Sequence, residues 1–148
     1  MKKLFLYYSL SGNGDAVAEY LQKKGYEIRK VESEKKPPKA FFFQIMKCGF
    51  NAGRGYCEPL KDYDADVSAY DEIVIGSPVW NGRLSCPINT VLKETALDGK
   101  KLTFVLYSGS GAAPKATAKL SERFGDAEIL HLKEPKKNPD ALYRLTEI

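Results

Sequence analysis

Residues 3–14 read KLFLYYSLSGNG, an apolar run that passes directly into a loop of hydroxyl, glycine and asparagine residues. The run is apolar on both faces, which is typical of a strand buried in a parallel sheet. Apolar residues then follow at helical spacing, so the pattern predicts a helix over residues 12–22. The loop is therefore expected at the carboxyl end of a strand, where a helix begins.

The rest of the chain repeats this alternation. Further strands are predicted over residues 26–31, 72–76, 102–107 and 127–132, and further helices over residues 87–95, 112–124 and 139–148. Parallel strands need crossover connections, and helices on both faces explain why several strands are apolar on both sides. We therefore predict an α/β fold with three layers and a doubly wound parallel sheet.

Length and composition limit the class of protein. The chain has 148 residues, 43% of them hydrophobic and 28% charged, which predicts a single domain over residues 1–148. The net charge is +4, but basic and acidic residues are mixed along the chain, so we do not predict binding of nucleic acid. No apolar run reaches the ~20 residues of a membrane span, and the N-terminal run has no cleavage site. These features favour a cytoplasmic protein.

Cysteine and histidine are scarce. The three cysteines, Cys48, Cys57 and Cys86, form no Cys-x-x-Cys pair, and His131 is the single histidine. We predict reduced thiols and no metal site.

An insertion over residues 33–60 does not fit the simple alternation. It begins with a charged connector that contains two prolines, continues with an aromatic stretch at residues 40–48, and ends in a glycine-rich turn. One interpretation is a helix that packs its aromatic side chains on the sheet. In the other interpretation, these aromatic side chains help to cover a ligand site.

Three loops follow strands at the predicted carboxyl edge of the sheet, where open α/β sheets bind ligands. The loop at residues 9–14 places backbone N–H groups at a helix start, which can bind phosphate without a basic side chain. The alternative is a plain connection with a capping Ser or Asn. The loop matches neither the nucleoside-triphosphate motif nor the dinucleotide fingerprint.

The two other loops are also unusual in composition. Residues 76–83 contain the single tryptophan, Trp80, before an Asn-Gly pair that tolerates positive φ angles. A loop position favours an indole that stacks on a planar ligand, although tryptophan is more often a core residue. Residues 108–113 are small and polar, which suits either close backbone contact with a ligand or a flexible connection. Together the three loops favour a mononucleotide with a flat aromatic head.

The motifs resemble those of flavodoxins. Residues 8–14, YSLSGNG, are similar to the Ser-x-Thr-Gly-Asn-Thr phosphate loop, and residues 70–80 resemble the third strand and its following loop. The resemblance covers practically the whole chain. It implies a five-stranded sheet in the order 2-1-3-4-5 and one non-covalently bound FMN.

The resemblance also implies which residues contact FMN, and it implies no catalytic or metal-binding residue. The phosphate would lie on Ser9, Leu10, Ser11, Gly12, Asn13 and Gly14. The isoalloxazine would be lined by Ser77, Pro78, Val79, Trp80, Asn81 and Gly82, with Trp80 stacked on it. Its pyrimidine edge would contact Ser108, Gly109, Ser110 and Gly111.

Three departures from the family pattern affect the functional interpretation. Gly14 replaces the usual threonine, Asp15 places a carboxylate beside the phosphate loop, and the third loop lacks a tyrosine. The leading hypothesis is a carrier of low-potential electrons between redox partners, and its partner is expected to be a redox protein or a small electron donor or acceptor. An NAD(P)H- or quinone-dependent FMN oxidoreductase is the second hypothesis, favoured by the missing tyrosine. A binding module that has lost FMN is the third, supported by Gly14 and Asp15.

Overall fold

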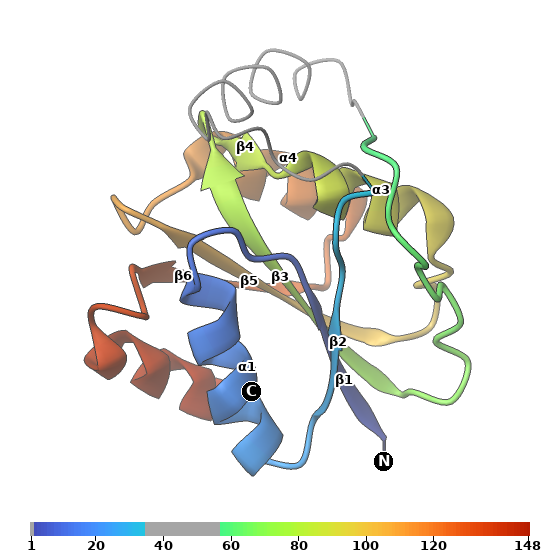
Figure 1. Ribbon diagram of the computed structural model, residues 1–148, viewed down its shortest axis with the longest axis horizontal. Helices are drawn as coiled ribbons and strands as arrows, with labels where there is room; N and C mark the ends of the chain where they lie inside the picture. Colours follow the sequence, from blue (N-terminus) through green and yellow to red (C-terminus); the bar gives the residue numbers. More distant parts are fainter. Residues whose placement is uncertain (1, 35–56) are drawn as a thin grey trace.

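The computed structural model describes residues 2–34 and 57–148, and five parallel strands form its central sheet (Figure 1). These strands are β1 (Lys3–Tyr7), β2 (Glu27–Lys30), β3 (Glu72–Trp80), β5 (Lys101–Ser108) and β6 (Glu128–Lys133). Their order is β2-β1-β3-β5-β6, which confirms the predicted order 2-1-3-4-5. A short strand, β4 (Arg83–Leu84), adds an antiparallel pair to the end of β3.

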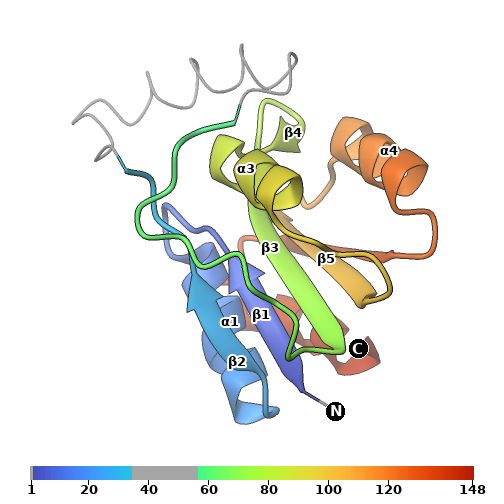
Figure 2. The same ribbon diagram turned by 90° about the vertical axis from the view of Figure 1, so that its right-hand side faces the viewer.

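In the described residues, four helical segments lie on the two faces of this sheet. They are α1 (Asn13–Lys23), α3 (Cys86–Glu94), α4 (Pro114–Arg123) and the closing segment η1 (Pro139–Glu147). Helix α1 and η1 cover one face, and α3 and α4 cover the other (Figures 1 and 2). The closing segment is a helix of the tighter 3₁₀ type, a form that is common at the ends of elements. The three predicted layers are confirmed.

Alternate residues of the central strands point to opposite faces, which produces two separate cores. One core, under α3 and α4, includes Leu4, Leu6, Ile73, Ile75, Phe104 and Leu106. The other, under α1 and η1, includes Phe5, Tyr7, Val74, Val105, Tyr107 and Leu132. This two-sided burial is the physical reason why the central strands read as continuous apolar runs.

The strand register places the ends of the central strands at one edge. Tyr7 of β1 lies opposite Gly76 of β3, and Pro78 lies opposite Tyr107 of β5. The edge continues to β6, where Lys133 lies opposite Ser108. The segments that follow β1, β3 and β5 are therefore neighbours at the carboxyl edge, as the sequence predicts.

Two sequence predictions need correction. Strand β3 does not end at Gly76 but continues to Trp80, because it pairs with β4 through Val79–Leu84 and Trp80–Arg83. The stretch predicted as a loop is therefore a β-hairpin. The prediction of reduced thiols is also wrong for Cys86, which is disulfide-bonded.

Most of the predicted insertion, including the helix expected at residues 40–48, lies outside the described residues. Its two flanks lie side by side: the Glu34 N–H donates to the Pro59 carbonyl at 2.9 Å, and the Lys61 N–H donates to the Glu32 carbonyl at 2.9 Å. In the part of the chain that the structure describes, no helix has the length and apolar character needed to cross a membrane.

Candidate functional site at the carboxyl edge

The loop between β1 and α1 is organised around the hydroxyl of Ser9. Its oxygen accepts the N–H of Gly12 at 3.2 Å and the N–H of Gly14 at 3.0 Å. Gly12 adopts φ = 95°, a left-handed conformation that residues with a Cβ rarely adopt. These contacts fold the loop back over the end of β1, so that helix α1 begins directly above the sheet edge.

The loop leaves backbone donors available. Within the described part of the chain, the N–H groups of Ser11, Asn13 and Asp15 donate to no protein atom. The first N–H groups of a helix have no partner in the helix and carry partial positive charge. This donor set therefore fits a phosphate group, which offers several acceptor oxygens and a negative charge.

Gly14 has a packing role that the sequence does not show. A Cβ built on it would lie 2.5 Å from the Tyr107 hydroxyl oxygen, 2.8 Å from the Ser9 Cβ and 2.8 Å from the Tyr7 ring. Only glycine lets helix α1 approach the ends of β1 and β5 this closely.

The carboxylate of Asp15 is engaged by two neighbours. Its Oδ1 atom accepts the Tyr7 hydroxyl at 2.6 Å and the Lys30 ammonium at 2.9 Å. Partial burial by itself would raise the pKa of Asp15, but the hydrogen bonds from Tyr7 and Lys30 outweigh it, so that the pKa is lowered. The carboxylate is thus ionised and paired.

The hairpin of β3 and β4 follows the next strand along the edge. Asn81 and Gly82 form its two-residue turn with φ values of 51° and 75°, as the Asn-Gly pair predicts. The N–H of Ala116 donates to the Gly82 carbonyl at 3.2 Å, which ties the turn to the start of α4. Pro78 and Val79 are half-buried along the hairpin, whereas Asn81 is exposed.

Two predicted ring-binding residues of this hairpin lie in the core. Ser77 is fully buried, and its Oγ accepts the Ser85 N–H at 3.1 Å and donates to the Pro78 carbonyl at 2.8 Å. Trp80 is 4% exposed and meets the Tyr8 ring edge-on, with ring centroids 5.7 Å apart. The indole is therefore a core side chain at the sheet edge, and its stacking on a ligand stays a prediction.

The third segment, Ser108–Gly111, forms a compact polar turn. The Ser108 hydroxyl accepts the Gly111 N–H at 3.0 Å, and Gly111 adopts φ = 74°. Gly109 has open space around it, and the Ser110 side chain is exposed. The small side chains leave this part of the edge accessible.

The tertiary structure adds two lysines that the sequence analysis missed. Lys30 ends β2 and pairs with Asp15, and Lys136 follows β6. The Lys136 N–H donates to Asn13 Oδ1 at 3.2 Å, and its Nζ donates to the Ser11 carbonyl at 3.4 Å. Because Lys136 and Ser11 are 125 residues apart, no local pattern could have indicated this contact.

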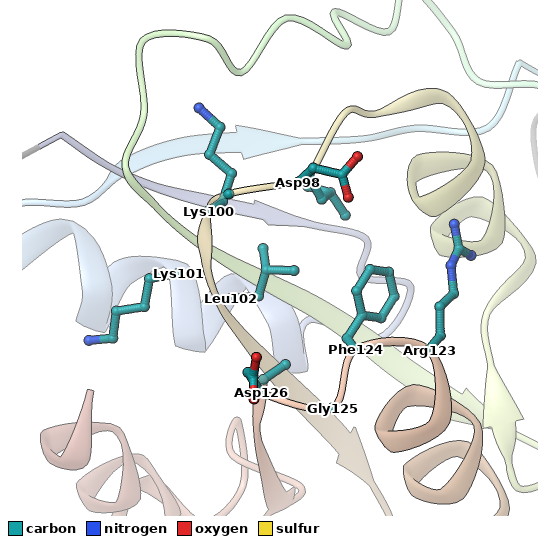
Figure 3. Close-up of a pocket in the computed structure, with 11 residues that line it drawn as sticks. Asp98, Lys100, Lys101, Leu102, Arg123, Phe124, Gly125 and Asp126 are labelled. Carbon is teal, nitrogen blue, oxygen red and sulfur yellow. The ribbon is translucent and has the colours of Figure 1, made fainter.

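The described residues hold no metal cluster, and one of their cavities lies away from the carboxyl edge. Residues 2–34 and 57–148 contain no group of three or more His, Cys, Asp or Glu side chains that could hold a metal ion. A cavity of about 390 Å³ lies at the amino ends of β5 and β6, lined by Asp98, Lys100, Leu102, Arg123 and Phe124 among others (Figure 3). Its Arg123 and Lys100 side chains bind backbone carbonyls, and it is remote from the three segments of the carboxyl edge.

Comparison with known proteins finds similarity in structure. A candidate flavoprotein from Bacteroides eggerthii has a TM-score of 0.78 and 19% identity over 99% of this chain and 96% of its own. A flavoprotein from Lactobacillus acidophilus, solved in complex with FMN, has a TM-score of 0.71 and 23% identity over 86% of this chain and 89% of its own. A flavodoxin from the domain Archaea has a TM-score of 0.54 and 20% identity over 98% of this chain and 93% of its own.

No protein-family profile matches the sequence, and no curated protein is detectably similar to it. The likeness to the solved structures therefore lies in the architecture. With five parallel strands in the order 2-1-3-4-5 between two helical layers, the chain has the flavodoxin-like fold.

Proposed function

We propose that this protein binds FMN at the carboxyl edge of the sheet and carries electrons between redox partners. The observation that supports this function most directly is the set of open N–H donors on Ser11, Asn13 and Asp15, at the start of the first helix. The likeness to the Lactobacillus acidophilus flavoprotein, solved in complex with FMN, supports the same ligand.

Different segments of the chain would bind the phosphate and the ring system of FMN. The loop at residues 9–14 would hold the phosphate through its backbone, with Ser9 fixing the loop shape. The hairpin turn at Asn81–Gly82 and the segment Ser108–Gly111 would line the ring system. When bound, FMN supplies the electron-transfer chemistry, while the protein supplies position and electrostatic environment.

Two contacts weigh against the alternative of a binding module that has lost FMN. Gly14 is explained by its close approach to Tyr107, so the absent threonine does not indicate a decayed site. Asp15 is paired with Tyr7 and Lys30, which lowers its repulsion toward a phosphate.

A titration of the purified protein with FMN tests the proposal. We expect quenching of flavin fluorescence with a saturable endpoint of one FMN per chain. Riboflavin, which lacks the phosphate, should bind more weakly. If the protein does not quench flavin fluorescence at concentrations where flavoproteins of this fold are saturated with FMN, the proposal is wrong.

An NAD(P)H- or quinone-dependent FMN oxidoreductase is the second candidate function. The small side chains of Ser108–Gly111 favour it, because they leave room for a substrate beside the flavin. Steady-state oxidation of NADH or NADPH with a quinone distinguishes the oxidoreductase from the electron carrier. Turnover that saturates with both substrates would support the oxidoreductase, whereas a carrier should show only slow background oxidation.

The redox partner follows from this proposal as a prediction. We expect a redox partner protein or a small electron donor or acceptor. A cytoplasmic location stays a prediction from the sequence, and the disulfide at Cys86 argues against it, because cytosolic disulfides are rare.

A further inference from the structure

Lys136 reaches the start of helix α1 from the opposite end of the chain. Its side chain lies across Gly12: a Cβ on that glycine would be 3.0 Å from the Lys136 Cδ and 3.1 Å from its Nζ. The ammonium donates to the Ser11 carbonyl at 3.4 Å. One bond leaves two of the three N–H donors of the ammonium for another acceptor.

The backbone around Lys136 is held in place by the turn that follows β6. The Glu134 N–H donates to the Ser108 carbonyl at 3.0 Å, and the N–H groups of Lys137 and Asn138 donate to the Glu134 carbonyl at 2.9 Å each. The Lys136 N–H is bound by the Asn13 side chain. These bonds connect the turn both to the phosphate loop and to the third segment of the carboxyl edge.

The position of this cation is electrostatically unfavourable by itself. A helix start carries partial positive charge, so that a nearby ammonium is repelled and an anion is attracted. Lys136 is one of the charges that lower the pKa of Asp15, but the Asp15 carboxylate already accepts the Tyr7 hydroxyl and the Lys30 ammonium, and Glu134 pairs with Lys137 at 3.4 Å. The positive charge of Lys30, Lys136 and the helix start is therefore larger than the single negative charge of Asp15.

We propose that Lys136 is a binding residue for the phosphate of the flavin nucleotide and makes the protein prefer FMN over riboflavin. This inference rests on the proposed function and adds a side-chain cation to a loop that otherwise offers backbone donors. A phosphate dianion between Lys136 and the N–H groups of Ser11 and Asn13 would accept charge-assisted hydrogen bonds from both. It would also offset the repulsion between the ammonium and the helix start.

Three variants test this role by equilibrium binding rather than by activity. Lys136→Gln removes the charge but keeps the length of the side chain, and Lys136→Arg keeps the charge. Lys137→Gln is the matched control, because its ammonium pairs with Glu134 instead of the loop. Each variant is titrated with FMN and with riboflavin by quenching of flavin fluorescence, at low and high salt, after thermal melting has shown that it folds.

We expect Lys136→Gln to weaken FMN binding about tenfold at low salt and less at high salt. Its riboflavin affinity should be unchanged. Lys136→Arg should retain most of the FMN affinity, and Lys137→Gln should match the original protein. Equal FMN affinity in Lys136→Gln, or an equal loss for FMN and riboflavin, would overturn the inference.

A second measurement separates this inference from the proposed function. Inorganic phosphate, compared with chloride at equal ionic strength, should raise the melting temperature of the original protein but not of Lys136→Gln. If phosphate has this effect and no flavin binds, the anion role of Lys136 stands and the FMN proposal fails. If FMN binds and Lys136→Gln behaves like the original protein, the FMN proposal stands and the role of Lys136 fails. If neither phosphate nor flavin binds, both are overturned.

Discussion

The Tyr107 hydroxyl oxygen lies 2.5 Å from the point where a Cβ on Gly14 would be. The Tyr107 side chain is fully buried, and its hydroxyl donates to the Tyr8 carbonyl. Burial raises the pKa of Tyr107 well above its ordinary value, so the phenol stays neutral and keeps this bond. The departure of Gly14 from the flavodoxin-like motif is therefore a consequence of packing between helix α1 and strand β5.

Replacing Gly14 by the threonine of the flavodoxin motif should destabilise the protein. The new side chain would overlap Tyr107, Ser9 and Tyr7, and overpacking of this kind costs about 1–3 kcal/mol. Chemical denaturation of Gly14→Thr measures the loss. Gly109→Ala is the control, because nothing lies within 4 Å of its added Cβ, and its stability should change little. Equal stability of Gly14→Thr and the original protein would contradict the packing argument.

The buried carboxylate of Glu72 should stabilise the amino end of the sheet. Its side chain is 2% exposed, accepts the Tyr26 hydroxyl at 2.8 Å, and pairs with Lys3 at 3.8 Å and Lys101 at 3.7 Å across the neighbouring strands. Glu72→Gln keeps an acceptor for Tyr26 but removes both ion pairs. We expect a loss of about 1–3 kcal/mol in the free energy of unfolding.

Glu19→Gln provides the comparison for Glu72, because Glu19 pairs with Lys23 on an exposed helix surface. Pairs of this kind contribute about 0.5 kcal/mol or less. Urea denaturation of both variants at neutral pH measures the difference. If Glu72→Gln loses no more unfolding free energy than Glu19→Gln, burial adds nothing to the ion pairs of Glu72.

Asp15 should contribute a small, pH-dependent stability. Its pKa is lowered in the folded protein, so its contribution is complete above the ordinary carboxyl pKa of about 3.9 and disappears as the pH falls through the lowered value. Asp15→Asn should lose less than about 1 kcal/mol at pH 7, because the pair with Lys30 is partly exposed. Denaturation curves of both proteins should converge in strong acid.

The same variant reports on phosphate binding. Without the carboxylate, Asp15→Asn leaves Lys30 and Lys136 uncompensated beside the loop, and we expect FMN affinity to rise by a few fold at low salt. Riboflavin affinity should stay the same. A fall in FMN affinity would mean that Asp15 holds the loop in its binding shape rather than repelling the phosphate.

Trp80 should behave both as a core residue and as part of the ring site. Because it is the single tryptophan and is 4% exposed, its fluorescence emission should be blue-shifted and poorly quenched by acrylamide. Aromatic contacts contribute about 0.5–1.5 kcal/mol beyond burial, so Trp80→Leu should weaken FMN binding roughly two- to tenfold.

Trp80→Phe is the matched variant, because it keeps an aromatic ring beside Tyr8, and it should retain more of the affinity than Trp80→Leu. In each variant, the affinity for riboflavin should fall by the same factor as the affinity for FMN, because the predicted contact is with the ring system that both ligands share. If Trp80→Leu binds FMN as tightly as the original protein, the indole is a core side chain that does not contact the ligand.

The order of strands and helices could be predicted from the residue pattern alone. The alternation of two-sided apolar runs with helical spacing has a local physical cause, because strands buried on both faces need apolar residues throughout. The residues of the loop at 9–14 and the Asn-Gly turn at 81–82 were likewise visible, since helix starts and two-residue turns select small and polar residues.

The side chains that meet at the carboxyl edge could be identified only from the tertiary structure. It extended β3 into a hairpin, placed Trp80 in the core, turned Asp15 toward Tyr7 and Lys30, and brought Lys136 to Ser11. Such contacts join residues that are up to 125 positions apart, and their geometry depends on sheet register and packing rather than on neighbours in the chain. The sequence therefore determined the scaffold and its loops, and the assembled sheet determined the charges that surround the first helix.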